Sequence, residues 1–410
     1  MVGAGIAGLT VALALAERGY SVCIFERAPK LEEVGAGLQL SPNATRILDR
    51  LGVIERLRAA SVQPEAIVLR RARSLREITR VPLGAAAIAR WGAPYLTVHR
   101  ADLQSALLSR VQREPSIRLL TGATVRDAAY HARGVTLSVD HGGAIIEAAG
   151  DLVIAADGVW STMRGAGDDR RSSFSGLVAW RSTLQRGGAG GDQDADQDTG
   201  RNTGQDTGQD AVLSSSVVTA FLHRRFHLIA YPIRAGQALN LVAVMRGEAL
   251  RHSWSVSGSR EELTRAFSGA PALARLVSQT SPWRRWPLHT VDPDGPWTSA
   301  RGIALMGDAA HAMTPFAAQG AAMAIEDAHV LADSLHRNRN DLAAGLALYE
   351  TARKPRVKHV VRRGAFNRFA WHASGPVALG RDIVLKLRGP ERTMQDFDWL
   401  YGWGMPKPLD

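Results

Sequence analysis

Three glycines at the start of the chain constrain its fold more than any other feature. Gly3, Gly5 and Gly8 form the pattern G-x-G-x-x-G. In this pattern the first glycine makes a tight turn, the second lets a pyrophosphate approach the backbone, and the third lets the following helix pack closely. Apolar residues at helical spacing follow, and then an apolar run that ends in Glu26, where an acidic side chain binds the ribose of an adenosine. The stretch therefore predicts a βαβ unit that binds a dinucleotide.

The strand that should precede these glycines is short. A strand usually has about five or six residues, but only Met1 and Val2 come before Gly3. We therefore expect either a natural start further upstream or a chain that lacks most of a central strand. Expressed from this start, the chain is expected to be poorly soluble and to bind its cofactor weakly, because a central strand is buried on both faces.

The composition favours a globular protein of two interleaved domains. The chain has 410 residues, of which 45% are hydrophobic and 22% charged, as in ordinary globular proteins. The net charge of +11 comes from scattered basic residues without a nucleic-acid-binding motif, so we expect it to attract an anionic dinucleotide and an anionic substrate, and we expect no nucleic acid. The single cysteine, Cys23, excludes a disulfide framework and favours the cytoplasm. No apolar run reaches the roughly 18 residues of a membrane span.

Two further buried strands are predicted to deliver loops to the nucleotide site. One ends in Asp157 and Gly158, and the other ends in Gly307 and Asp308. The carboxyl ends of the strands in an open α/β sheet lie at the edge where ligands bind, so these loops are expected to meet the glycine loop. Between the two strands, alternating patterns from residue 175 onward predict a second, β-rich sheet.

These patterns predict an α/β (α+β) fold in interleaved parts. We expect a Rossmann-like nucleotide-binding domain at 1–65, 95–170 and 285–340, a β-rich substrate domain at 66–94 and 171–284, and a C-terminal helical region at 341–410. Strand patterns at 118–125, 134–140 and 144–148 predict a small antiparallel meander. The tract at 187–210 has almost no apolar residues and is predicted to be a disordered insertion. Its aspartates match no calcium-loop spacing, and no metal site is predicted.

Five motifs together resemble a known family. They are GAGIAGL (3–9), FER (25–27), HRADLQ (99–104), DLVIAADGVWSTMR (151–164) and GDAAHAMTPFAAQGAAMAIEDA (307–328). The set resembles the FAD-dependent aromatic monooxygenases, in the branch that contains salicylate, 3-hydroxybenzoate and 6-hydroxynicotinate hydroxylases. The resemblance implies an FAD-binding domain, NAD(P)H as co-substrate, and insertion of oxygen from O2 into a phenolic ring through a flavin C4a-hydroperoxide. It implies a small aromatic substrate, and we expect a monomer or a homodimer.

The resemblance also implies roles for individual residues. The pyrophosphate of FAD would lie on Gly3, Gly5 and Gly8, and its adenosine on Glu26 and Arg27. Further contacts with FAD are implied for Gln39, Arg100 and Asp308, and for the backbone N–H groups of Gly320 and Ala321 at a helix N-terminus. Asp157, Gly158 and Arg164 match the motif that the family uses for both FAD and NAD(P)H. From the sequence alone, without the resemblance, Arg100 and Arg164 would be expected to form surface ion pairs.

Three residues match family positions that face the substrate. His227 is the candidate base that removes the phenol proton, Tyr231 is a hydrogen-bond partner of the substrate, and Pro315 lies beside the reacting ring. His227 and Tyr231 are four residues apart on a predicted strand, so their side chains point to the same face. A histidine and a tyrosine that only stabilise a domain interface are the structural alternative.

Two departures from the family pattern bear on the substrate. Gln39 stands where the hydroxynicotinate enzymes have a histidine, and Phe316 follows Pro315 in place of a polar residue. Both favour a benzenoid phenol, such as a hydroxybenzoate or salicylate, over hydroxynicotinate. A monooxygenase of a larger aromatic secondary metabolite and an inactive flavin-binding protein are the alternatives.

Overall fold

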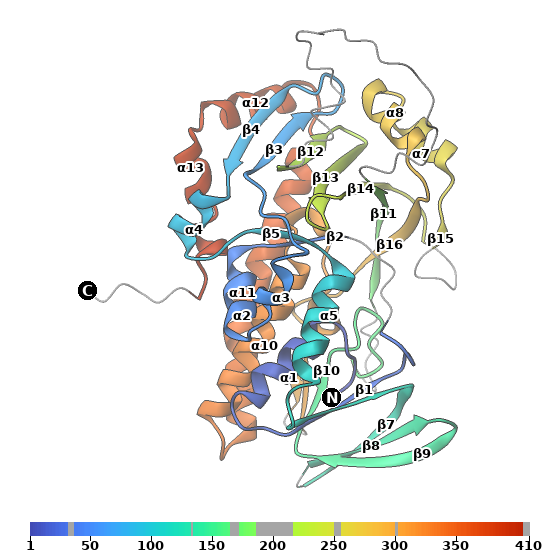
Figure 1. Cartoon of the computed structure of the whole chain (residues 1–410), viewed down its shortest axis with the longest axis vertical. Helices are drawn as coiled ribbons and strands as arrows, with labels where there is room; N and C mark the ends of the chain where they lie inside the picture. The colour runs from blue at the N-terminus through green and yellow to red at the C-terminus, as the bar shows by residue number, and fades with distance from the viewer. Residues whose placement is uncertain are drawn as a thin grey trace, which may run out of the picture.

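The expected mixed α/β fold is confirmed. A computed structural model describes residues 1–31, 37–132, 134–164, 172–185, 216–249, 256–299 and 302–404 (Figure 1). The predicted insertion at 187–210 and the last six residues lie outside the described ranges. The helices and strands form a nucleotide-binding part, an eight-stranded sheet and a set of C-terminal helices.

A parallel sheet lies at the centre of the nucleotide-binding part. Its strands are β1 (Val22–Glu26), β6 (Ile117–Thr121), β10 (Val153–Ala155), β18 (Ile303–Leu305) and the antiparallel β17 (Thr298–Ser299). Val2 joins the two halves of this sheet through parallel bridges to Phe25 and Ala155. The backbone N–H of Val2 donates to the Ile154 carbonyl at 2.9 Å. Val2 thus occupies the position of the central strand, between β1 and β10.

Helices cover this sheet. The long ones are α1 (Ile6–Ala16), α5 (Arg100–Val111) and α10 (Gly320–Arg337), and α1 contacts the other two. Helix α1 lies between α5 and α10, so nearly all of its surface is buried. This explains why its residues are apolar on all sides. The remaining short elements are β2 (Gly37–Leu40), α2 (Pro42–Arg50), α3 (Ile54–Leu57), β5 (Leu96–His99), α9 (Asp308–His311) and the 3-10 helix η1 (Pro315–Ala317).

The predicted meander is present, but its first strand begins later than the sequence pattern indicates. Its strands are β7 (Ala123–His131), β8 (Gly134–His141) and β9 (Ala144–Gly150). Residues 117–121 instead form β6 in the parallel sheet, because Gly122 adopts a φ of +65° and breaks the chain direction between the two strands. The pattern at 118–125 therefore spans two different sheets.

The second sheet has eight strands. In spatial order they are β15 (Val256–Ser257), β16 (Arg284–Thr290), β11 (Ser173–Gln185), β14 (Ala238–Arg246), β13 (Phe226–Ile233), β12 (Val217–Leu222), β3 (Ala66–Arg71) and β4 (Glu77–Pro82). Helices α7 (Arg260–Ala266) and α8 (Pro271–Gln279) supply leucines to an apolar core against one face of this sheet. The helix α4 (Ala85–Trp91) follows β4.

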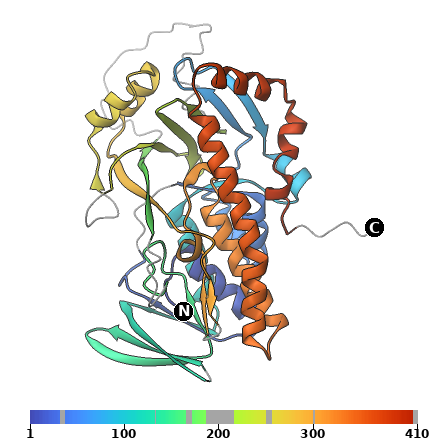
Figure 2. The ribbon, with the colours of Figure 1, turned by 180° about the vertical axis from the view of Figure 1, so that it is seen from behind.

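The C-terminal helices lie across both parts. The longest, α11 (Leu342–Trp371), includes Pro355 and runs along the molecule beside α10 (Figure 2). It is followed by α12 (Gly375–Leu387), α13 (Pro390–Gln395) and α14 (Asp398–Tyr401). The end of α11 reaches the eight-stranded sheet, so it carries aromatic side chains to that sheet.

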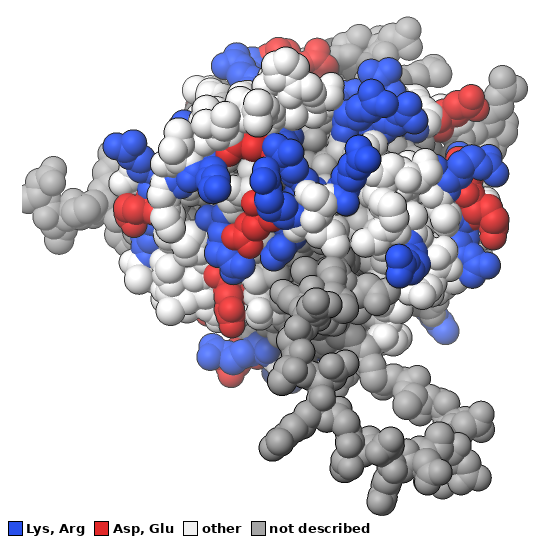
Figure 3. Space-filling view, turned by 90° about the horizontal axis from the view of Figure 1, so that it is seen from above, with Lys and Arg blue, Asp and Glu red and all other residues white. Residues whose placement is uncertain are grey.

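The basic residues are scattered over the surface, as the sequence indicates. On the face shown in Figure 3, lysine and arginine side chains are spread among acidic and uncharged ones and form no single stripe. Among the described residues, no helix is both long and apolar enough to cross a membrane.

Candidate active site

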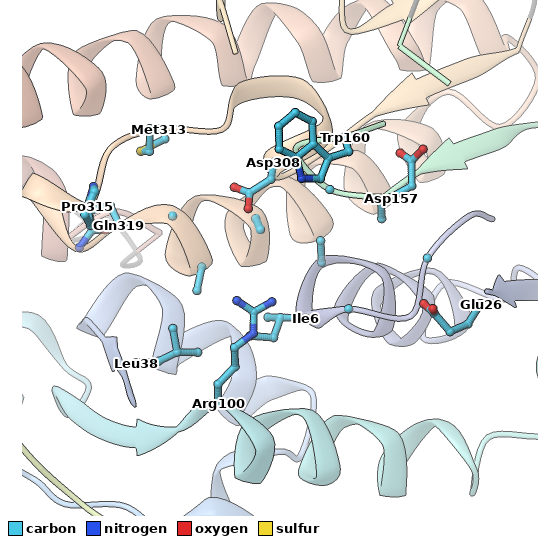
Figure 4. Close-up of a pocket in the computed structure, with 18 of the residues that line it drawn as sticks. Ile6, Glu26, Leu38, Arg100, Asp157, Trp160, Asp308, Met313, Pro315 and Gln319 are labelled. Atoms are coloured by element: carbon cyan, nitrogen blue, oxygen red, sulfur yellow. The ribbon is translucent and has the colours of Figure 1, made fainter. Parts of the chain in front are cut away.

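A cavity of about 500 Å³ lies where the nucleotide-binding part meets the eight-stranded sheet. The glycine loop, the start of α5 and the loop after β10 line one portion, and β11, β13 and β14 line another. The segment that joins α9 to α10 lines the region between them (Figure 4). Residues far apart in the sequence therefore meet in one space.

The three glycines of the fingerprint have different surroundings. A Cβ on Gly3 would lie 2.6 Å from the Ala156 carbonyl oxygen, and the φ of Gly3 is +97°. A Cβ on Gly8 would overlap the carbonyl oxygen of Gly3. A Cβ on Gly5, which lines the cavity, would meet nothing within 4 Å. Gly3 and Gly8 thus allow the loop and α1 to pack, while Gly5 leaves room for a ligand.

Glu26 and Arg27 lie at one edge of the cavity. The carboxylate of Glu26 accepts hydrogen bonds from the backbone N–H of Ala4 at 2.8 Å and of Ala28 at 2.9 Å. These bonds hold the carboxylate against the glycine loop, at the end of β1. This is the position that ribose recognition requires in a dinucleotide fold.

The loop after β10 also reaches the cavity, through Asp157 and Gly158. Asp157 accepts a hydrogen bond from the Thr162 N–H at 2.9 Å, and its buried Oδ1 has no partner among the described residues. Arg164 lies outside the cavity lining. Its Nε donates to the Ala309 carbonyl at 2.8 Å, so it ties this loop to α9. Burial lowers the pKa of the Arg164 guanidinium.

Asp308 and Arg100 face the cavity from different elements, as Figure 4 shows. Asp308 opens α9, and Arg100 opens α5. The backbone N–H of Gly307, just before Asp308, donates to the Asp327 carboxylate at 2.9 Å. Asp327 therefore positions the loop that presents Asp308.

A buried ion network beneath the cavity was missed by the sequence interpretation. Arg353 donates to Asp327 at 2.7 Å and to Glu326 at 2.5 Å, and His311 Nε2 lies 2.6 Å from Asp327. Arg356 donates to the other oxygen of Glu326 at 2.9 Å. Burial raises the pKa of Asp327, but His311 and Arg353 outweigh burial and lower it to about 2. The signal in the sequence was a pair of adjacent carboxylates inside the otherwise apolar stretch at 321–328.

The N-terminus of α10 points at the cavity. Gly320 and Ala321 form its first turn and line the cavity, as does Gln319 before them. The side chain of Gln319 donates to the Ser41 hydroxyl at 3.0 Å, which fixes the start of the helix. Unpaired N–H groups and the helix dipole favour negative charge at such a terminus. Pro315 also lines the cavity.

The eight-stranded sheet supplies Tyr231 to the cavity lining. Burial raises the pKa of Tyr231, which keeps the hydroxyl protonated. Gln39 lines the cavity nearby and accepts a hydrogen bond from the Tyr95 hydroxyl at 2.8 Å. A protonated tyrosine hydroxyl beside an amide can both donate to and accept from a bound polar group.

His227 lies on the same face of β13 as Tyr231, as the spacing predicts, but outside the cavity lining. Its ring is 4.9 Å from that of Phe316 and 5.1 Å from that of Trp371. Its Nδ1 is 3.1 Å from His372 Nε2, and its buried Nε2 has no partner among the described residues. Burial, together with His372, lowers the pKa of His227 to about 3, so the imidazole is neutral at neutral pH.

The structure brings most of the predicted site residues together. Those that line the cavity are Gly3, Gly5, Glu26, Arg27, Gln39, Arg100, Asp157, Gly158, Tyr231, Asp308, Pro315, Gly320 and Ala321. Gly8, Arg164 and His227 lie outside the lining. Arg181 and Trp160 line the cavity and were missed. For Arg181 the only signal was a basic residue among the apolar ones of a buried strand.

These residues fit FAD. The open face of Gly5 admits a pyrophosphate, the Glu26 carboxylate suits a ribose, and the first turn of α10 offers N–H groups to an electron-rich ring. The cavity joins all three.

Comparisons with known proteins agree with this fit. The family of FAD binding domains matches residues 1–364. A 3-hydroxybenzoate 6-hydroxylase of Polaromonas naphthalenivorans (strain CJ2) is 32% identical over 405 residues, which cover 98% of this chain and 95% of that protein. A 3-amino-4-hydroxybenzoate 2-monooxygenase of Streptomyces platensis is 34% identical over 406 residues, 98% of this chain and 95% of that protein.

A solved structure extends the comparison to the fold. HpxO of Klebsiella pneumoniae, complexed with FAD and uric acid, has a TM-score of 0.80 and 25% identity, and the match covers 98% of this chain and 96% of that one. The predicted cofactor, FAD, and the predicted class of enzyme, a monooxygenase, are confirmed, and use of NAD(P)H is typical of such enzymes. The chain belongs to the FAD-binding domain family and is an FAD-dependent monooxygenase.

Proposed function

We propose that this enzyme uses NAD(P)H and O2 to hydroxylate a phenolic aromatic such as 3-hydroxybenzoate or salicylate. The observation that carries the proposal is the continuity of one cavity from Gly5 to Tyr231. The same space thus holds a glycine that is open to a pyrophosphate and a protonated tyrosine hydroxyl that suits a phenol. The relative from Polaromonas naphthalenivorans, which is named for 3-hydroxybenzoate, supports the choice of substrate.

FAD would be held by the residues that the motifs single out. We assign the pyrophosphate to Gly3, Gly5 and Asp308, with Gly8 packing beneath the loop, and the adenosine to Glu26 and Arg27. Gln39, Arg100, Asp157 and Gly158 would contact the remainder of the cofactor, and Arg164 would hold the loop that carries Asp157. Gly320 and Ala321 would face the flavin. When bound, FAD would take electrons from NAD(P)H and activate O2 for transfer to the phenol ring.

The protein's own part is to hold the phenol and remove its proton. Tyr231, which lines the cavity, would hydrogen-bond the phenol oxygen, and Pro315, which also lines it, would lie beside the reacting ring. His227 is the candidate base because it is neutral and its Nε2 has no partner among the described residues. Its low pKa makes it a weak base in the free enzyme, but a phenolate formed close by would raise that pKa.

Aromatic rings shield this end of the site from water. Phe316 is 1% exposed, follows Pro315, which lines the cavity, and has its ring 4.9 Å from that of His227. Trp371 packs on both rings. A dry site protects the reactive oxygen from unproductive loss and strengthens each hydrogen bond to the substrate.

The experiment is a product analysis with labelled oxygen. The purified enzyme is supplied with NADH or NADPH and 18O2, together with 3-hydroxybenzoate or salicylate, and the products are examined by mass spectrometry. One labelled oxygen atom in the ring is the expected result. If neither phenol is labelled while a larger aromatic metabolite is, that alternative replaces this proposal, and a protein that binds flavin but labels nothing is inactive.

A substitution tests the base. We expect His227→Ala to leave FAD binding intact and to slow turnover by about a hundredfold, within the usual range for loss of a general base. His223→Ala is the matched control, since His223 lies just outside β13 on the same hairpin. Turnover of His227→Ala at the wild-type rate would show that the base lies elsewhere.

We also propose a cellular location and binding partners for the enzyme. We place it in the cytoplasm, where NAD(P)H is available and a lone cysteine stays reduced. We expect a monomer or a homodimer that takes a small aromatic substrate and O2 and binds no nucleic acid.

A further inference from the structure

The eight-stranded sheet contributes one charged side chain to the described lining of the cavity. Its contributions are Arg181, Ile229, Tyr231 and Val242. Arg181 comes from β11, Val242 from β14, and the other two from β13. The residues expected to hold FAD come from other elements, apart from the sheet. Arg181 therefore belongs to the part of the cavity that is left for the substrate.

The strand register orders these four residues. Arg181 pairs with Val242, and Val242 pairs with Ile229, so the three form one row across the sheet. Tyr231 lies two residues beyond Ile229 on the same face of β13. A ligand on this face would meet a cation at one end, two aliphatic side chains in the middle, and a phenol hydroxyl at the far end.

The surroundings of Arg181 leave part of its hydrogen-bonding capacity unused. Its guanidinium carbon lies 4.9 Å from the centre of the Trp286 ring, which fixes the plane of the group. Its buried Nε–H has no hydrogen-bond partner among the described residues. Among the described residues, Tyr231, Arg100 and Asp308, which face the same cavity, act on it electrostatically. A buried donor without a partner is costly unless a ligand completes it.

We propose that Arg181 binds the carboxylate of the substrate, so that this enzyme acts on phenols that carry an acid group and discriminates against neutral phenols. The planar guanidinium fork matches a carboxylate, which accepts two parallel hydrogen bonds from it. The ring of the substrate lies on Val242 and Ile229, and its hydroxyl group is directed to Tyr231. This inference rests on the proposed hydroxylation of a phenol.

The test compares an acid with a neutral analogue in the flavin-loaded enzyme. Binding of 3-hydroxybenzoate and of 3-hydroxybenzyl alcohol is measured by the change in flavin absorbance, without NAD(P)H. The variants are Arg181→Met, which keeps an unbranched apolar stem without the guanidinium, and Arg181→Lys, which keeps the charge but not the fork. Arg285→Met is the matched control, because Arg285 stacks on Trp180 at 5.1 Å in the same sheet but does not line the cavity.

We expect Arg181→Met to weaken binding of 3-hydroxybenzoate by about 10-fold to 100-fold, the usual loss for a charged hydrogen bond. Binding of the alcohol should change by less than about threefold, Arg181→Lys should fall between wild type and Arg181→Met, and Arg285→Met should bind as wild type. The inference is overturned if Arg181→Met weakens both ligands equally, if it leaves acid binding unchanged, or if its main effect is loss of FAD.

Turnover separates this inference from the proposed function. A wild-type enzyme that binds the acid selectively through Arg181 but yields no hydroxylated product would contradict the proposed reaction and retain the carboxylate site. If the enzyme hydroxylates 3-hydroxybenzoate equally well with and without Arg181, the proposed reaction is retained and the carboxylate site is contradicted.

Discussion

The two walls of the cavity differ in how their buried polar groups are satisfied. Beneath the cavity, the charged groups of Arg353, Glu326 and Asp327 all have partners, and in this network only His311 Nδ1 has none among the described residues. On the sheet, the described structure leaves His227 Nε2, Asn240 Nδ2 and Arg181 Nε without partners. Each unpaired buried group costs about 1–3 kcal/mol. The network therefore stabilises the fold, whereas the polar groups of the sheet lower its stability and are suited to a ligand.

The largest effect is expected in the network. Arg353→Met should lower the free energy of unfolding by about 3–5 kcal/mol, because it removes the guanidinium that pairs with both buried carboxylates and leaves only Arg356 beside Glu326 among the described residues. Denaturation by urea measures this. Arg337→Met is the control, since its pair with Asp333 at 2.8 Å is exposed and is worth about 0–1 kcal/mol. An equal loss of stability in the two variants would show that the buried network stabilises the fold no more than a surface ion pair does.

A buried histidine of the eight-stranded sheet, His227, should make the free energy of unfolding depend on pH. The folded pKa of His227 is about 3, and an unfolded histidine titrates near about 6.5. Between these values the unfolded chain binds a proton that the folded chain does not. The free energy of unfolding therefore falls as the pH falls below about 6.5, by up to about 1.4 kcal/mol per pH unit from this residue.

Substitution isolates that contribution. His227→Gln should show a shallower loss of stability than wild type between about pH 6.5 and pH 4, measured by urea denaturation at each pH. His141→Gln, an exposed position, should follow the wild-type curve. Parallel curves for wild type and His227→Gln would mean that His227 is not held neutral by burial.

The smallest effect on stability is expected at Gly5. Gly5→Ala should change the free energy of unfolding by no more than about 1 kcal/mol, because a Cβ there meets nothing within 4 Å. It should weaken FAD binding about tenfold or more, equivalent to about 1.4 kcal/mol, as followed by flavin fluorescence. Gly150→Ala, also with open space around its Cβ, should change neither property. Unchanged FAD affinity in Gly5→Ala would place the pyrophosphate elsewhere.

Local patterns predicted the parts of the site that depend on nearby residues. The glycine loop, Glu26 at the end of β1 and Asp308 after β18 follow from the strand, turn and helix order, and the structure brings them into one cavity. The family resemblance added Tyr231, whose position in a strand fixes the face to which it points.

Local sequence patterns could not predict the contacts between elements that are far apart in the chain. Arg353 is 27 residues from Glu326, and only the packing of α11 on α10 brings them together. His227 lies beside Trp371 and His372 because α11 ends at the sheet, and this packing sets the low pKa of His227. Gly122 divided one apolar pattern between two sheets through a φ of +65°.

Whether this enzyme is a flavin-dependent hydroxylase of phenols can be decided from the visible spectrum of the purified protein, followed by its rate of NADH and NADPH oxidation with and without 3-hydroxybenzoate and salicylate. We expect flavin bands and oxidation that one of these phenols accelerates, with a hydroxylated product. The absence of flavin, or flavin whose reduction no phenol accelerates, would contradict this expectation.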